Sequence, residues 1–344
     1  MKRILLPIIL VAVLVLTAAC GNGGGDKSGS KDGKNGKLVI YNGQHKSATS
    51  ALIKAFEKDT GIKVEERDGK SNELAHQIVE EGKNSPADLI YTEESSPQIM
   101  LDNKGLLAKI DKDASKPIDS KYKSKDDTWT GLLARSRVVA YNKDKISESE
   151  LPKSVKDLTD SKWKDKFAFQ PTSGAFQAQL SAMIKLEGKD AAKEWLEGIK
   201  KNGKTYKDNK RALQAVENGD IPFALINNYY WDRQAAEKGK DNLNSRLYFF
   251  GNHDLGDMLT VASVGVVKSS KHKEEAEKFV KFATSKKGQQ ILTDKSKQYP
   301  LNKEANTKGM KPFSELKPPE GTQDLGKYAD GKEAVNLLKE EGLL

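Results

Sequence analysis

From residue 37 onward, apolar and polar positions follow strand-like and helix-like periods in alternation. Residues 37–42 and 87–91 are short apolar runs typical of buried strands, and residues 62–67 alternate apolar and charged positions. Between them, helices are predicted over residues 47–61 and from Ser71 through Ile78, because their apolar residues fall on one face. This βαβαβ order indicates a parallel, doubly wound α/β sheet, in which ligands bind beyond the carboxyl ends of the strands.

The same alternation continues through the rest of the chain. Strands are predicted over residues 131–141, 222–226 and 258–267. Helices are predicted over residues 175–187, 189–201, 209–218, 273–292 and 333–338. This order fits two α/β lobes joined by two long strands, which would cross between the lobes near Arg137 and near Val261.

The first 36 residues have the pattern of a targeting segment followed by a tether. A positive start at residues 1–3 precedes an apolar run over residues 4–15, which is shorter than the roughly 20 residues that span a bilayer. Small residues before Cys20, the only cysteine, resemble a lipobox, so we expect cleavage after residue 19 and a lipid on the Cys20 thiol. Residues 21–36 contain only Gly, Ser, Lys, Asp and Asn, which predicts a flexible tether. A simple membrane anchor with an incidental cysteine is the alternative.

Composition narrows the class of protein without identifying it. Of the 344 residues, 36% are hydrophobic and 31% are charged. This composition is more polar than that of an average globular protein but is compatible with a packed core. The net charge is +9, yet the lysines are interleaved with Asp and Glu along helical faces, as on a solvated surface. We therefore expect no nucleic-acid partner.

Candidate polar residues follow the first and third predicted strands. Among the four histidines no pair has the spacing of a zinc helix, and His76 and His272 are expected at the surface. His45 differs, because it lies just past the first strand, where a ligand loop is expected. Glu93 and Glu94 follow the third strand, although two adjacent carboxylates are more often solvated surface.

Tyr229 and Tyr230 form the most distinctive candidate site. In a strand, neighbouring side chains point to opposite faces, but at a strand-to-helix turn they can converge, and Asn227 and Asn228 favour such a turn. A phenol has a pKa of roughly 10, so only a strong Lewis acid such as Fe(III) ionises it at neutral pH. Aromatic packing with Trp231 is the alternative for this pair.

Residues 171–175 precede a predicted helix and consist of Pro, Thr, Ser, Gly and Ala. Small residues at a helix N-terminus leave backbone N–H groups free to point at an anion. An ordinary loop in which Ser173 caps the helix is the alternative.

Together, these segments resemble the ferric-ion-binding receptors of bacterial iron importers, the "bacterial transferrins", from about residue 37 to the C-terminus. The matching motifs are YNGQHK (41–46), SPAD (85–88), RSRVV (135–139), PTSGAF (171–176), LQAVENGDI (213–221), INNYYW (226–231) and YPLN (299–302). The resemblance implies the α/β type II periplasmic binding protein fold, with two doubly wound lobes and a two-strand hinge. Lobe 1 would comprise residues 37–136 and 262–310, and lobe 2 residues 137–261 and 311–344.

The resemblance also implies a ligand set for Fe(III). Its metal ligands fall on His45, Glu93, Tyr229 and Tyr230. Its synergistic anion, phosphate or carbonate, would be held by Ser173, Gly174, Ala175, Asn209 and Asn227. The position after the carboxylate ligand is commonly glutamine in the family and is Glu94 here, whose charge would repel a phosphate unless Arg135 or Arg137 offsets it.

The function that the resemblance implies is transport without catalysis. We expect a monomeric receptor, lipid-anchored to the outer face of the cell membrane, that delivers Fe(III) to the permease of an ABC importer. A receptor for a small oxyanion or phosphonate on the same scaffold is one alternative. A secreted hydrolase using Glu93 and Glu94 is another, although adjacent residues rarely give the ~5–9.5 Å opposed geometry of glycoside chemistry.

Overall fold

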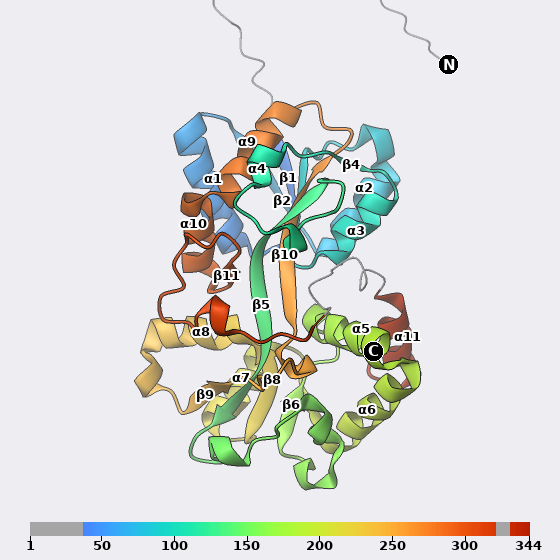
Figure 1. The fold of residues 1–344 in the computed structure, drawn as a ribbon, viewed down its shortest axis with the longest axis vertical. Coiled ribbons are helices and arrows are strands. Elements are labelled where there is room, and N and C mark those ends of the chain that lie inside the picture. Colours follow the sequence, from blue (N-terminus) through green and yellow to red (C-terminus); the bar gives the residue numbers. More distant parts are fainter. Residues whose placement is uncertain (1–36, 321–330) are drawn as a thin grey trace, which may run out of the picture. The chain divides into compact units, whose positions relative to one another are not determined.

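Strands and helices alternate along residues 37–320 and 331–344, the parts of the chain that the computed structural model describes (Figure 1). The predicted signal peptide, the tether and Cys20 lie outside these residues. The strands are β1 (Leu38–Asn42), β2 (Val64–Asp68), β3 (Leu89–Thr92), β4 (Leu107–Ala108), β5 (Trp129–Asn142), β6 (Phe167–Phe169), β7 (Lys204–Thr205), β8 (Phe223–Asn227), β9 (Ser245–Tyr248), β10 (Leu259–Val267) and β11 (Tyr299–Pro300). The helices are α1 (Lys46–Thr60), α2 (Ser71–Glu81), α3 (Ser96–Asn103), α4 (Lys112–Ser115), α5 (Gly174–Glu187), α6 (Lys189–Asn202), α7 (Asn209–Asn218), α8 (Asn228–Lys238), α9 (Lys273–Thr284), α10 (Lys286–Ser296) and α11 (Lys332–Glu340). Within the described ranges, none of these helices is long and apolar enough to cross a membrane.

The strands form a mixed sheet in the order β2-β1-β3-β10-β5-β8-β6-β7. In the first half, β1 is parallel to β2 and β3, which is the predicted βαβαβ unit, and β10 closes it antiparallel to β3. In the second half, β6 is parallel to β7 and β8, while β8 and β9 pair antiparallel with β5. The carboxyl ends of β1 and β3 therefore reach the same edge of the sheet.

The long strand β5 belongs to both halves of the sheet. Its residues up to Ser136 pair with β10, whereas Arg137 and the following residues pair with β8 and β9. All of β5 is buried, and Figure 1 shows β5 and β10 side by side between the two halves. The change of partner falls at Arg137, the position predicted for the first crossing.

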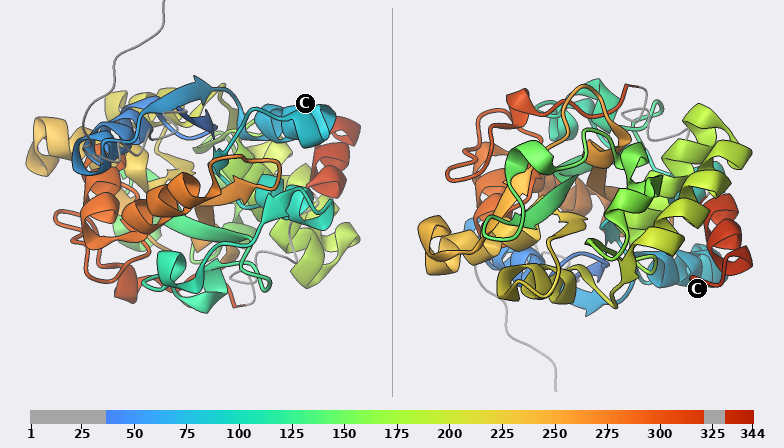
Figure 2. Two further views of the ribbon diagram at one scale, coloured as in Figure 1. Left: turned by 90° about the horizontal axis from the view of Figure 1, so that it is seen from above. Right: turned by 90° about the horizontal axis from the view of Figure 1, so that it is seen from below.

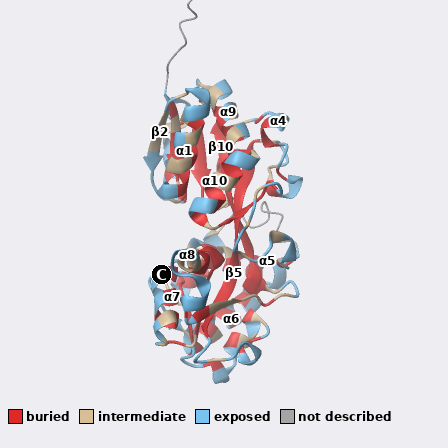
Figure 3. Cartoon of the chain, turned by 90° about the vertical axis from the view of Figure 1, so that its left-hand side faces the viewer, coloured by how far each residue is buried: buried red, intermediate tan, exposed pale blue. Residues whose placement is uncertain are grey.

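Alternation along the strands supplies a core on each face of the sheet. In β5, Val139 packs with the aromatic residues of β6, α5 and α6, while Val138 packs with α7 and α8. In the first half, α1, α9 and α10 cover one face, and α2 and α3 cover the other. Figure 2 shows helices on both sides of the central strands, and Figure 3 shows buried strands beneath helices with exposed outer faces.

The prediction of one helix over residues 273–292 is wrong, because two helices meet at Ser285. Ser285 has an extended backbone, with φ −65° and ψ 159°, and its hydroxyl accepts the Gly288 N–H at 3.1 Å. A Cβ atom on Gly288 would lie 2.1 Å from the carbonyl oxygen of Phe282, so only glycine allows this close approach. The apolar periodicity continues across the break and conceals the capping serine.

The surface position predicted for His272 is also only partly right. His272 is half-buried, and its Nδ1 lies 3.2 Å from both carboxylate oxygens of Asp88. The buried Asp88 carboxylate also accepts the backbone N–H of Val39 at 2.8 Å. His272 therefore belongs to a polar contact that holds the start of β1.

We expect Asp257, at the end of the short helix η7 (Leu255–Asp257), to make stability depend on pH. Burial raises the pKa of this carboxyl to about 7, although it accepts N–H groups from Phe250 and Gly251. Since the folded-state pKa lies above the unfolded value of roughly 4, the contribution is complete below that value and is lost as the pH rises through about 7. As the pH rises from about 4 to about 7, the unfolding free energy of the unaltered protein should fall, and Asp257→Asn should make this fall smaller when measured by urea unfolding. An unchanged slope, or an equal reduction in the exposed Asp126→Asn control, would contradict this assignment.

Candidate metal centre

His45 is held in the loop between β1 and α1. The Asn42 side chain accepts the Gln44 N–H at 3.0 Å, and the Gln44 side chain accepts the His45 N–H at 2.8 Å, so this loop is internally braced. Burial, together with the charges of the nearby Arg233 and Arg135, lowers the pKa of His45 to about 4. The buried Nε2 atom has no hydrogen-bond partner. At neutral pH the imidazole is thus uncharged, the form that can donate a lone pair to a metal ion.

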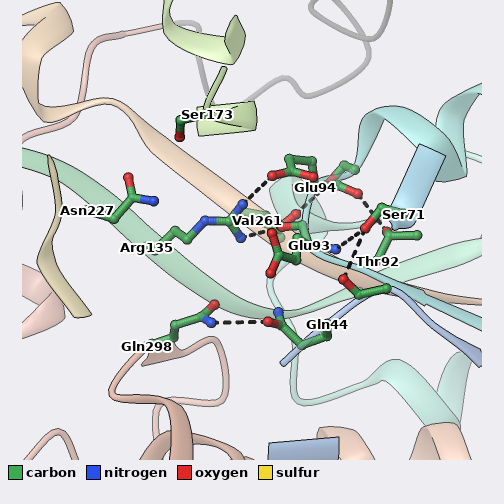
Figure 4. Close-up of polar contacts among 12 residues, drawn as sticks. Gln44, Ser71, Thr92, Glu93, Glu94, Arg135, Ser173, Asn227, Val261 and Gln298 are labelled. Atoms are coloured by element: carbon green, nitrogen blue, oxygen red, sulfur yellow. Dashed lines mark hydrogen bonds and ion pairs between the residues drawn. The ribbon is translucent and has the colours of Figure 1, made fainter. Parts of the chain in front are cut away.

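Glu93 lies in the loop after β3, beside His45. Its Oε1 is 3.8 Å from His45 Nε2. The Ser71 hydroxyl accepts the Glu93 N–H at 3.0 Å and donates to the Gly43 carbonyl at 3.3 Å (Figure 4). A Cβ atom on Gly43 would lie 2.5 Å from Ser71 Oγ, so the glycine permits this approach. Ser71 therefore ties the loop that carries His45 to the loop that carries Glu93.

Tyr229 and Tyr230 lie in the first turn of α8, directly after β8, so the predicted strand-to-helix turn is confirmed. Their rings stack with centroids 4.3 Å apart, and the His45 ring stands edge-on to Tyr229 at 5.3 Å. Tyr229 is only 3% exposed. Residues 45, 93 and 229, distant in sequence, are thereby brought together.

The aromatic-packing alternative describes Trp231 better than the tyrosine pair. Trp231 Nε1 donates to the Ser245 carbonyl at 3.2 Å and to its hydroxyl at 3.1 Å, and its ring is buried against α7. Tyr230 is half-buried and packs partly against the same cluster, whereas the Tyr229 ring contacts His45. Packing accounts for Trp231, but it leaves the stacked phenols of Tyr229 and Tyr230 unexplained.

Two arginines, Arg135 and Arg233, lie near the Tyr229 side chain. Burial raises its pKa well above the usual 10, the neighbouring Tyr230 adds to the increase, and Arg135 opposes it. The Arg233 guanidinium carbon lies 5.3 Å from the centre of the Tyr229 ring. The N-terminal end of α8 also favours negative charge. Sequence reasoning did not single out Arg233, although its place four residues after Tyr229, one helical turn along α8, is the signal that would have found it.

Glu94 is held by the buried Arg135. Arg135 Nη2 lies 2.5 Å from Glu94 Oε1, and Arg135 Nη1 donates to the backbone carbonyl of Glu93 (Figure 4). Burial raises the pKa of Glu94, and the Arg135 charge opposes this increase. The two adjacent carboxylates therefore differ in environment, since Glu93 is near His45 and Glu94 is paired with Arg135.

The predicted anion-binding residues lie at three helix N-termini. Ser173, Gly174 and Ala175 begin α5, Asn209 begins α7, and Asn227 precedes α8. Asn209 Nδ2 lies 3.5 Å from Ser173 Oγ, and the Ser173 side chain makes no capping bond, contrary to the alternative of an ordinary capped loop.

Arg137 contacts the residues at two of these helix ends, those of α7 and α8. Its Nη1 is 3.2 Å from Asn227 Oδ1 and 3.4 Å from Asn209 Oδ1. Arg137 is 1% exposed, and burial lowers its pKa to about 10, which still leaves it charged at neutral pH. Its Nε and Nη2 atoms have no hydrogen-bond partner. A buried cation with free donors beside helix N-termini is an environment that favours an anion.

Carboxylates and histidines alone do not form a metal centre in this structure. Over residues 37–320 and 331–344, no group of three or more His, Cys, Asp or Glu side chains is placed to hold a metal ion. A centre at His45 and Glu93 therefore depends on the phenols of Tyr229 and Tyr230. Hard phenolate and carboxylate oxygens with one imidazole suit a hard, highly charged cation.

The chain is similar to extracellular solute-binding and ferric iron-binding proteins. Residues 51–318 match the family described as bacterial extracellular solute-binding protein. The chain is 42% identical over 310 residues to the major ferric iron-binding protein of Neisseria meningitidis, covering 89% of this chain and 93% of the relative. It is 37% identical over 309 residues to the Fe(3+)-binding periplasmic protein of Serratia marcescens, covering 89% and 90%. The crystal structure of iron-bound HitA from Pseudomonas aeruginosa matches with a TM-score of 0.83 and 47% identity, covering 89% of this chain and 99% of that one.

We expect the Glu94–Arg135 pair to stabilise the metal-free protein as a unit. Arg135→Gln leaves the half-buried Glu94 carboxylate without its partner, which should lower the unfolding free energy on the order of 2 kcal/mol. Adding Glu94→Gln should recover most of that loss, because both charges are then removed. Urea unfolding of the single and double variants measures the coupling. The exposed Arg67→Gln change, which breaks the Arg67–Glu65 pair, should cost within about 1 kcal/mol. Purely additive effects of the Arg135 and Glu94 changes would contradict the pairing.

Proposed function

The chain belongs to the bacterial extracellular solute-binding protein family, and we propose that it captures Fe(III) outside the cytoplasm and delivers it to the permease of an ABC importer. It is a binding protein of the type II periplasmic binding protein fold and not an enzyme. The observation that carries this function is the meeting of two stacked phenols with a neutral imidazole and a carboxylate from another part of the sheet.

We propose His45, Glu93, Tyr229 and Tyr230 as the iron ligands. Once ionised, the two phenols and the carboxylate carry three negative charges, which match the charge of Fe(III), while His45 adds a neutral donor. Because burial holds the Tyr229 proton at neutral pH, iron must displace it, and binding should release protons. Lower pH therefore favours release of the metal.

Domain closure is the proposed route of capture. We assign residues 37–136 and 262–310 to lobe 1, which carries His45 and Glu93, and residues 137–261 and 311–344 to lobe 2, which carries the tyrosine pair. The change of strand partners in β5 at Arg137 supports a hinge there, and the second crossing would lie near Val261 in β10. Iron would meet one lobe first, and bending of the hinge would bring in the ligands of the other. Opening, protonation of the phenols or reduction to Fe(II) would release it.

An anion is proposed to complete the iron environment. Ser173, Gly174, Ala175, Asn209 and Asn227 are the proposed anion-binding residues, with phosphate or carbonate as the expected species. Their place at three helix N-termini and the free N–H groups of Arg137 support this assignment. Glu94, whose carboxylate lies at the start of α5, decides whether a free anion is needed there.

The location of the protein follows in part from its family. It acts outside the cytoplasm as a solute-binding protein, with a permease as its partner. We propose in addition that a lipid on Cys20 anchors it to the outer face of the cell membrane, that residues 21–36 tether it there, and that it is a monomer.

A receptor for a small oxyanion or phosphonate is the second candidate, favoured by the unpartnered Nε and Nη2 atoms of Arg137. The two functions differ in what the metal-free protein binds. An oxyanion receptor binds inorganic phosphate at full strength without iron, whereas an iron receptor does not. Calorimetry of metal-free protein with phosphate, before and after addition of iron, distinguishes them.

We expect the iron-loaded protein to show a visible phenolate-to-iron charge-transfer band. Replacing both tyrosines, Tyr229→Phe and Tyr230→Phe, should abolish the band and lower iron affinity by at least about a hundredfold, because the two anionic donors are lost. Visible spectra and metal analysis of the isolated protein measure both effects. Tyr206→Phe, a half-buried tyrosine on the same side of the sheet, is the matched control and should leave both unchanged. Retention of the band and of the affinity in the double variant would exclude this site.

A further inference from the structure

The Glu94 carboxylate lies against the start of α5. A Cβ atom built on Gly174, the first residue of that helix, would be 2.9 Å from Glu94 Oε1. The same oxygen is 2.5 Å from Arg135 Nη2. Glu94 comes from the loop after β3, whereas α5 belongs to the other half of the sheet. Its carboxylate therefore connects the loop that carries Glu93 to one of the helix ends proposed to bind an anion.

The surroundings of this carboxylate are those that stabilise a negative charge. The first turn of a helix presents backbone N–H groups without intrahelical partners and the positive end of the helix dipole. The Arg135 side chain is 3% exposed. The buried Arg137 contacts Asn209, whose amide lies 3.5 Å from the Ser173 hydroxyl at the start of α5, and two of its nitrogen atoms have no partner. These groups favour a negative charge at this place, and the Glu94 carboxylate already provides one.

A cavity gives solvent access to the same place. It has a volume of about 820 Å³, and both Glu94 and Gly174 line it, together with Asn72 and Gln177. An exogenous oxyanion entering by this cavity would meet the Glu94 carboxylate at the start of α5. Two negative charges in one partly buried site repel each other strongly, so the resident carboxylate excludes the incoming anion.

We infer that Glu94 is a built-in counter-anion, which occupies the anion position beside the iron ligands and makes metal loading independent of free phosphate or carbonate. This inference rests on the proposed iron-binding function and specifies the anion of the same site. Arg135 positions the carboxylate through one nitrogen and contacts the Glu93 backbone through the other, so the counter-anion and the proposed ligand are held by one side chain. With Arg135 paired in this way, Arg137 is the charged group that faces the helix ends without a carboxylate partner.

Neutralising Glu94 should convert the protein to anion dependence. In Glu94→Gln, Arg135 loses its counter-charge, and inorganic phosphate becomes able to occupy the start of α5. Without phosphate, we expect the iron affinity of this variant to fall on the order of tenfold. Added phosphate should restore the affinity and shift the charge-transfer band, because a different anion then adjoins the iron.

The experiment loads purified protein with Fe(III) in degassed, bicarbonate-free buffer, with and without inorganic phosphate, and measures the visible band and the affinity by competition with a chelator. For the unaltered protein, we expect the same band and affinity in both buffers. Glu80→Gln, an exposed charge change on α2, should behave identically.

The outcomes separate this inference from the proposed function. A band in the unaltered protein that forms only with phosphate, or a Glu94→Gln variant with unchanged affinity and band in both buffers, would overturn the built-in counter-anion and leave iron binding intact. If the unaltered protein shows no band in both buffers, with phosphate and without it, iron binding itself would be overturned. Phosphate independence can be measured on the unaltered protein alone, so the test holds even if Glu94→Gln fails to fold.

Discussion

Burial of the Tyr229 phenol is the constraint on which the rest of the proposed site depends. In this environment the phenol keeps its proton at neutral pH, so only a cation with a strong preference for hard anionic oxygen replaces that proton. The stacked Tyr230, the N-terminus of α8 and the nearby Arg135 determine what the replacement costs. The same burial that keeps the free phenol protonated would make the proposed complex with Fe(III) specific.

The sheet explains how the other proposed ligands come to lie near this phenol. The strands β1 and β3 are parallel and end at the same edge, which places the loops of His45 and Glu93 together, and Ser71 joins them. The long strand β5 continues into the second half of the sheet, where β8 leads directly into the tyrosine turn. Arg135 and Arg137 lie on β5 where its pairing changes, so the strand that joins the halves also carries the charges of the site.

Much of this arrangement was predictable from the sequence, for identifiable reasons. Short apolar runs between amphipathic helices indicated the doubly wound halves, and the Asn227-Asn228 step indicated the turn that stacks the tyrosines. The break at Ser285 was missed because apolar periodicity persists across it, and the contact of His272 with Asp88 depends on packing between distant segments. The pairing of Glu94 with Arg135 and its contact with Gly174 join residues from two halves of the sheet, which local pattern does not encode.

One ferric ion is proposed to be bound jointly by groups from both halves of the sheet. A crystal structure of the iron-loaded protein, with anomalous scattering recorded at the iron absorption edge, tests this most directly. We expect a single strong anomalous peak within bonding distance of the Tyr229 and Tyr230 phenol oxygens, His45 Nε2 and a Glu93 carboxylate oxygen. An iron peak away from the tyrosine pair, or one bound by groups from only one half of a closed molecule, would contradict it.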